Sequence, residues 1–118
     1  MLKNLSKKST IIAKVHLAES YFSKMRGLMF ERKKNFDYAL VLCLDEESRL
    51  KASIHMLFVF FPIAVFFLDS HKKVVDKKLM KPFSLNYTPK KASKYIVELP
   101  SEKINGAEVG DVLSWSQD

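Results

Sequence analysis

The sequence is poor in cysteine, glycine and proline, with one, three and four of these residues in 118. The single cysteine, Cys43, excludes an intramolecular disulfide and is typical of proteins from a reducing compartment. So little glycine and proline argues against a linker or a low-complexity segment, and the length is that of one domain. We therefore predict a single domain over residues 1–118, in which residues 1–9 are free to form a flexible tail.

Several functional signatures are also missing. The N-terminal residues carry positive charge but lack the apolar stretch of a signal peptide, which favours a cytoplasmic protein. No P-loop, G-x-G-x-x-G or G-x-S-x-G motif is present. The three histidines, His16, His55 and His71, show no metal-ligand spacing. We predict no metal and no cofactor, and we identify no catalytic residue.

Arginine is scarce too, because only three of the 20 basic residues are arginines, although the net charge is +7. One segment holds eight lysines and a single acid, Asp76; the lysines are Lys72, Lys73, Lys77, Lys78, Lys81, Lys90, Lys91 and Lys94. Such a basic face can attract nucleic acid or an anionic surface. Readers of phosphates and bases usually rely on arginine, so a solvated lysine-rich surface is the favoured interpretation.

The longest apolar run extends from Ile54 to Leu68 and contains one polar side chain, His55. A membrane-spanning helix needs about 20 apolar residues, and this run is shorter. Its many β-formers and the central Pro62 instead predict two buried strands, Ser53–Val59 and Pro62–Leu68, joined by a tight corner. The run is therefore interpreted as the core of a folded domain, and no membrane span is expected.

The remaining pattern is mostly that of strands. Alternating or continuous apolar residues predict strands over residues 10–18, 38–44, 73–80 and 93–100, and a closing strand that carries Trp115. Ser20 and Gly27 have the positions of helix caps, so one short helix is expected near residues 20–27. The fold class predicted is mainly β, an antiparallel sandwich or small barrel. Cys43, within an apolar strand, is expected to be a small buried hydrophobe.

Four fragments in this order, AESYFSKMRGLMF, SIHMLFVFFPIAVFFLD, YIVELP and GAEVGDVL, give the chain its family likeness. The sequence resembles the uncharacterised family called domain of unknown function 192, in its archaeal-type branch. The resemblance covers about residues 18–113 and implies a jelly-roll-like β-sandwich with a short helix near its start. It implies no reaction, cofactor or partner. Ala64 departs from the aspartate that usually follows Pro-Ile in this family, which argues against chemistry that needs this carboxylate.

Polar residues within these motifs are the candidate site. Arg26, His55 and Glu98 are expected to contact a ligand in a cleft near the central motif, because they are polar residues set in otherwise apolar motifs and polar groups in apolar strands cost free energy unless they are hydrogen-bonded. The competing interpretations are structural: Arg26 paired with Glu98 or Asp111, and His55 bonded within the core. Asp69 and Asp111 are expected to stabilise turns.

No biochemical activity follows from these observations. The favoured function is a small binding or interaction domain for an unknown small ligand or protein partner. Two alternatives remain: nucleic-acid binding through the lysines between Lys72 and Lys94, and an enzyme that uses His55 as acid or base. An enzyme is the less favoured class.

Overall fold

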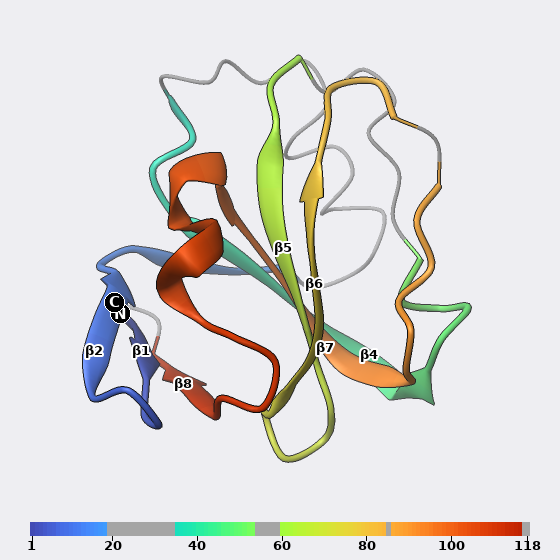
Figure 1. The fold of residues 1–118 in the computed structure, drawn as a ribbon, viewed down its shortest axis with the longest axis horizontal. Coiled ribbons are helices and arrows are strands. Elements are labelled where there is room, and N and C mark those ends of the chain that lie inside the picture. Colours follow the sequence, from blue (N-terminus) through green and yellow to red (C-terminus); the bar gives the residue numbers. More distant parts are fainter. Residues whose placement is uncertain (19–34, 54–59, 85, 117–118) are drawn as a thin grey trace.

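The computed structural model describes residues 1–18, 35–53, 60–84 and 86–116, and these residues form two β-sheets (Figure 1). The smaller sheet has three strands in the order β2-β1-β8, and the larger has five in the order β3-β4-β7-β5-β6. The strands are β1 (Leu2–Asn4), β2 (Ser9–Ile12), β3 (Val15–Ala18), β4 (Ala39–Ser48), β5 (Ile63–Leu68), β6 (Val74–Met80), β7 (Ser93–Pro100) and β8 (Leu113–Trp115). The fold is mainly β, as predicted, and the two sheets do not close into a barrel.

The strand β5 explains the long apolar run. All six of its residues are buried, because β5 lies between β7 and β6 and both faces of the five-stranded sheet are covered at this point. Phe66 and Phe67 point to opposite faces and are fully buried, and such a side chain contributes about 1.5–3 kcal/mol to folding. The predicted strand Pro62–Leu68 is thus confirmed, whereas the expected strand Ser53–Val59 lies mostly outside the described residues.

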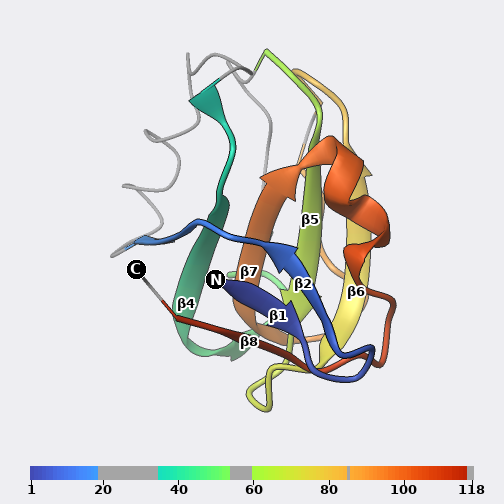
Figure 2. The ribbon, with the colours of Figure 1, turned by 90° about the vertical axis from the view of Figure 1, so that its left-hand side faces the viewer.

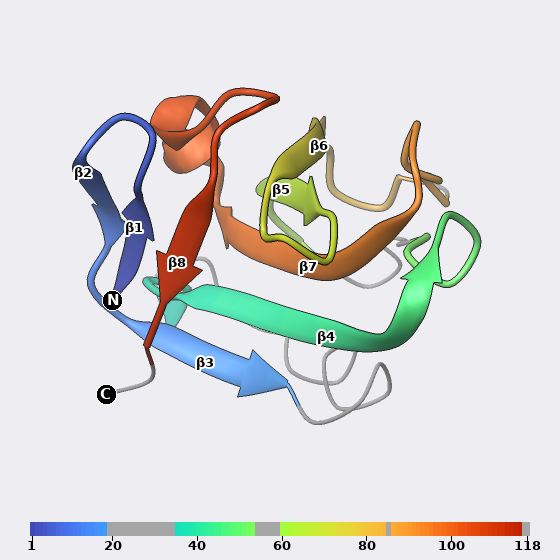
Figure 3. The same ribbon diagram turned by 90° about the horizontal axis from the view of Figure 1, so that it is seen from below.

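One face of the five-stranded sheet packs against the smaller sheet. Its side chains Ala64, Phe66 and Leu68 join Leu2 and Leu113 from the smaller sheet in one apolar cluster. Figures 2 and 3 show β1, β2 and β8 gathered on this side of the large sheet. The 3-10 helix η2 (Ser101–Gly106) contacts β5, β6 and β7, and it follows directly after β7. It is the only helix in the described ranges, and the expected helix near residues 20–27 falls outside them.

The opposite face of the large sheet, which we call the Glu98 face, has its own apolar cluster. Ile63, Val65 and Phe67 of β5 lie in this cluster with Leu40 and Ile96. The described residues outside the sheet that cover it include Phe36, Ala52 and Phe61. The five-stranded sheet therefore has an apolar cluster on each face, and a polar side chain on the Glu98 face has apolar neighbours.

Three expectations about the strands need correction. The predicted strand over residues 10–18 is two strands in different sheets, β2 and β3, because the chain crosses between the sheets while burying both Ile11 and Val15. The pairing is not wholly antiparallel, since β3 runs parallel to β4. Residues 1–9 are not a tail: Leu2 and Asn4 are fully buried, and β1 is the central strand of the smaller sheet.

The two ends of the described chain meet in the smaller sheet. Leu2 pairs with Trp115 across β1 and β8, and the Met1 ammonium donates a hydrogen bond of 2.7 Å to the Ser116 carbonyl.

In none of the described ranges does a helix have the length and apolar character needed to cross a membrane.

Candidate functional site

Glu98 occupies the centre of the large sheet. It lies on β7, the middle strand, with Leu40 of β4 on one side and Val65 of β5 on the other. Residues directly opposite each other in paired strands point to the same face, so the carboxylate lies on an apolar surface and is only 2% exposed. A buried carboxylate costs several kcal/mol unless its charge is compensated, and the two neighbours of Glu98 in its row are apolar.

The row that contains Glu98 extends across the whole sheet. Continuing from Val65, the next residue is Lys78 on β6; continuing from Leu40, it is His16 on β3. Because adjacent strands are about 4.8 Å apart, the α-carbons of Glu98 and Lys78 are separated by about 10 Å. The Glu98 face therefore has a buried acid at its centre and a basic residue at each edge, with His16 stacked on Tyr38 at 4.1 Å.

The other two predicted ligand contacts, Arg26 and His55, lie outside the described residues. The alternative partner considered for Arg26, Asp111, is bonded elsewhere. Its Oδ2 accepts hydrogen bonds from Asn4 Nδ2 at 2.9 Å, Lys7 Nζ at 3.3 Å and the Glu108 backbone N–H at 3.0 Å. The Glu108 amide, followed by the Asn4 amide, lowers the pKa of the Asp111 carboxyl. Asp111 thus anchors the N-terminal segment as well as a turn.

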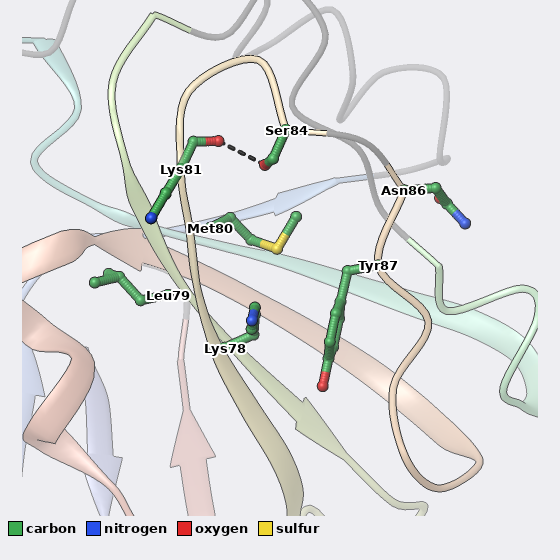
Figure 4. A pocket seen from close by; sticks show the side chains of 7 residues that line it. All are labelled: Lys78, Leu79, Met80, Lys81, Ser84, Asn86 and Tyr87. Atoms are coloured by element: carbon green, nitrogen blue, oxygen red, sulfur yellow. Dashed lines mark hydrogen bonds between the residues drawn. The ribbon is translucent and has the colours of Figure 1, made fainter.

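A pocket of about 300 Å³ opens beside the end of β6 (Figure 4). It is lined by residues 78–81 and by Ser84, Asn86 and Tyr87. Figure 4 shows Lys78 and Met80 on the side of β6 that faces Tyr87, whereas Leu79 and Lys81 extend to the other side. Met80 is buried in the cluster of the Glu98 face, so the pocket has an apolar floor and one inward ammonium group. We call it the Lys78 pocket.

Tyr87 forms a rigid wall of this pocket. Its hydroxyl donates a hydrogen bond of 2.5 Å to Asp76 Oδ2, and its ring contacts Phe67 with centroids 5.8 Å apart. Burial and then the Asp76 carboxylate raise the pKa of Tyr87 to about 12. The phenol therefore stays protonated at neutral pH and provides a wall rather than a proton-transfer group.

Asp76 is the acid that holds this wall in place. It is 4% exposed, and besides Tyr87 it accepts hydrogen bonds from the backbone N–H groups of Lys77 and Lys90. Sequence analysis named Asp76 only as the single acid of the lysine-rich segment, and it included neither Asp76 nor Tyr87 in the candidate site. A signal was present in the sequence, because Asp76 is the one acid in a lysine-rich segment and lies within a predicted strand.

The turn that follows β6 closes one end of the pocket. The Ser84 backbone N–H and hydroxyl both donate to the Lys81 carbonyl, at 3.2 and 2.6 Å. Phe83 within this turn has a φ of 58°, a left-handed conformation that costs a bulky residue about 1–2 kcal/mol. The turn holds Phe83, which is 51% exposed, edge-to-face with Phe60, which is 53% exposed, at 5.0 Å.

The eight lysines of the predicted basic face differ in the contacts that their ammonium groups make. Lys77 Nζ donates to the carbonyls of Ile104 and Ala107 and pairs with Glu108 at 3.0 Å. Lys72 Nζ lies 4.5 Å from the Trp115 ring centroid, and Lys94 Nζ donates to the Asp45 carbonyl. Lys78 Nζ lies 5.3 Å from the Tyr87 ring centroid. Within the described chain Lys77 is the only one of the eight predicted lysines with an ion pair; the others are Lys72, Lys73, Lys78, Lys81, Lys90, Lys91 and Lys94.

Two further expectations have clear outcomes. Cys43 is exposed, so its expected burial is wrong: it lies on β4 opposite Tyr95, beyond the area that the smaller sheet covers. Asp69 does stabilise a turn, since its Oδ1 accepts hydrogen bonds from the backbone N–H groups of His71 and Lys73.

Within the part of the chain that the structure describes, no three His, Cys, Asp or Glu side chains lie close enough together to hold a metal ion.

A two-sheet, mainly β domain is the class of protein that these features define. Residues 3–115 match the family described as "Uncharacterized ACR", domain of unknown function 192, and the chain belongs to this family. The UPF0127 protein of Thermococcus kodakarensis is 45% identical over 118 residues, which are 98% of this chain and 73% of that protein. The UPF0127 protein of Pyrococcus furiosus is 40% identical over 116 residues, 97% of each chain.

Solved structures share the fold. A protein of unknown function from Novosphingobium aromaticivorans has a TM-score of 0.74 at 16% identity, and the match covers 86% of this chain and 74% of that one. A Sinorhizobium meliloti protein, described as a proposed transcription regulator, also has a TM-score of 0.74, at 21% identity over 85% and 79% of the two chains. At these identities the similarity concerns the fold alone.

Proposed function

We propose that the protein is a small binding domain whose ligand site lies on the Glu98 face, with Glu98, Arg26 and His55 as its polar contacts. The observation that supports this proposal most strongly is the position of Glu98, 2% exposed and between Leu40 and Val65. A sheet centre is best filled with apolar side chains, and departures from this rule gather at functional sites. Arg26 and His55 are included as the polar residues of the family motifs. No reaction is part of the proposal.

The test combines binding with stability. Glu98→Gln keeps the shape of the side chain and removes its charge, and Glu102→Gln is the matched control because Glu102 is exposed and four residues away. Amide NMR spectra of the two variants and the wild type are recorded during titration with mixed metabolites and divalent cations. We expect shifts near Glu98 in the wild type and the control, and their loss in Glu98→Gln. A variant that unfolds more easily but responds to every titrant like the wild type would assign Glu98 a structural role alone.

Nucleic-acid binding through the lysine-rich segment is the second candidate. It is favoured by the lysines of this segment, seven of which form no ion pair within the described chain. Binding of a short single-stranded RNA is measured by fluorescence anisotropy at increasing salt, for the wild type and for a variant with Lys90 and Lys91 replaced by Gln. A steep loss of affinity with salt, reduced in the variant, supports this candidate. Affinity that is unchanged by the two substitutions counts against it.

A cytoplasmic location is also part of the proposal. Its support is chemical, since the exposed thiol of Cys43 is the only one in the chain and forms no intramolecular disulfide. Reducing compartments keep such thiols free. Labelling of Cys43 by a membrane-impermeant maleimide in intact cells, compared with lysed cells, tests the location: protection in intact cells is expected.

A further inference from the structure

The Lys78 pocket has a charge distribution that does not depend on Glu98 or on the ligand proposed for it. Lys78 extends from β6 toward Tyr87, with Nζ 5.3 Å from the ring centroid. The one acid nearby in sequence, Asp76, accepts hydrogen bonds from Tyr87 and from two backbone N–H groups. Its carboxylate binds the hydroxyl end of Tyr87, away from the open pocket. The ammonium of Lys78 therefore faces the pocket without an acidic partner within the described chain.

The walls of the Lys78 pocket are held in place by contacts within the protein. Tyr87 is held at its hydroxyl by Asp76 and at its ring by Phe67, and Met80 is 2% exposed in the core cluster. The Ser84 hydroxyl already donates to the Lys81 carbonyl, so it is not a free donor. What remains is the Lys78 ammonium and the Asn86 side chain beside an apolar floor. Because the walls are already held, a ligand has to order little besides these two side chains.

The size of the pocket limits the ligand. About 300 Å³ is at the lower end of the volumes of small-molecule sites, which accommodates one ring or a short chain rather than a dinucleotide. The unpaired Lys78 selects negative charge, and Met80 and the ring of Tyr87 favour an apolar body next to this charge. The positive charge of the whole segment adds a long-range attraction for anions.

We propose that the Lys78 pocket binds a small organic anion, a carboxylate or phosphate ester carried on an apolar body about the size of one ring. Lys78 contacts the anionic group, and Met80 and Tyr87 contact the body. This inference goes beyond the proposed function, because it rests on a different set of residues and holds whether or not Glu98 binds a ligand.

The experiment uses the whole chain and four probes: benzoate, phenyl phosphate, inorganic phosphate and benzyl alcohol. Binding is followed by amide NMR and by the methyl signal of ¹³C-labelled Met80. We expect benzoate or phenyl phosphate to shift the signals of residues 78–81 and Tyr87, with a Kd on the order of 1 mM for probes this small. The tighter binder of benzoate and phenyl phosphate identifies whether the pocket prefers a carboxylate or a phosphate ester. Inorganic phosphate and benzyl alcohol are expected to bind at least fivefold more weakly, since each lacks one half of the recognised chemistry.

Three variants separate the pocket from general charge attraction. Lys78→Gln is expected to weaken binding at least fivefold, and Lys78→Arg is expected to retain it. Lys73→Gln removes the same charge from an exposed lysine outside the pocket and is expected to bind like the wild type. The proposal is overturned if neither organic anion shifts these signals, if benzyl alcohol or inorganic phosphate binds as well, or if Lys73→Gln weakens binding as much as Lys78→Gln. Shifts around Glu98 alone would support the proposed function and overturn this inference.

Discussion

The hydroxyl of Tyr87 donates a hydrogen bond of 2.5 Å to the buried carboxylate of Asp76, and this bond fixes the loop after β6 to the edge of the large sheet. The same carboxylate accepts the backbone N–H of Lys90, three residues further along the loop. One buried acid therefore positions both Tyr87 and the return of the chain toward β7. A segment that has few apolar residues of its own is held by a small polar network.

Replacing Tyr87 by Phe removes one donor from Asp76 and leaves the ring in place. A hydrogen bond to a charged group contributes about 1.5–3 kcal/mol, so the free energy of unfolding is expected to fall by about 2 kcal/mol. Urea unfolding followed by circular dichroism measures the change. Tyr95→Phe is the matched control, because no hydrogen bond of the Tyr95 hydroxyl occurs in the described structure, and its effect is expected to be below about 0.5 kcal/mol.

The same phenol makes stability depend on pH in the alkaline range. The pKa of Tyr87 is raised to about 12 in the folded protein, whereas an unfolded tyrosine titrates near 10. The folded state therefore holds this proton more tightly, and its contribution to stability is complete below about pH 10 and is lost as the pH rises toward 12. We expect wild-type stability to fall more steeply than that of Tyr87→Phe between these values. Parallel curves in urea series at several pH values would contradict the assignment.

Asp111 is expected to have the opposite pH dependence. Its pKa is lowered in the folded protein, chiefly by the Glu108 amide and by Asn4. Its contribution to stability is therefore present above the unfolded pKa, near 4, and is lost as the pH falls through the lower folded value. Asp111→Asn is expected to lower the urea midpoint at pH 7 and to differ less from the wild type at pH 2.5. The fluorescence of Trp115, the only tryptophan, reports the unfolding, and Asp45→Asn is the control at an exposed acid.

Two adjacent lysines of β6 are expected to differ sharply when each is replaced by Met. Lys77 Nζ donates to two carbonyls around η2 and pairs with Glu108, so its loss leaves partly buried acceptors without a donor, at a cost of about 1–3 kcal/mol. Lys78 makes one exposed contact with the Tyr87 ring, and its replacement is expected to cost about 0.5 kcal/mol. Equal losses of stability in the two variants, measured by thermal or urea unfolding, would contradict the expected difference between Lys77 and Lys78.

The sequence allows the strands of the core to be predicted because their signal is local. The apolar residues 63–68 give β5 directly, and the alternation in residues 93–100 gives β7. In β7 both Ile96 and Glu98 are buried as well as Val97 and Leu99, because the strand is central and covered on both faces. Alternation alone indicates one covered face, so the burial of Glu98 at the sheet centre required the positions of β4 and β5.

The features that could not be predicted depend on residues that are distant in sequence. Leu2 is buried, and its partner in the pairing of β1 with β8 is Trp115, which lies 113 positions later in the sequence. No local sequence pattern distinguishes such a strand from a flexible tail. Cys43 lies in an apolar strand but at a position that the smaller sheet does not cover. The Lys78 pocket arises because Tyr87 is held against Asp76 across a loop, and lysine content alone indicates only a charged surface.

The pairing of β1 with β8 also affects how the chain reaches its structure. Closing a loop between Leu2 and Trp115 requires an ordering entropy larger than that of any hairpin in the molecule, and such distant contacts slow folding. The β1–β2 hairpin can form early because its pairing is local, whereas the pairing of β1 with β8 forms later. In a circular permutant that joins residue 116 to residue 1 and opens the chain at another turn, this distant contact becomes a local one. Such a permutant should keep the same two sheets and assemble the smaller one at an earlier stage of folding.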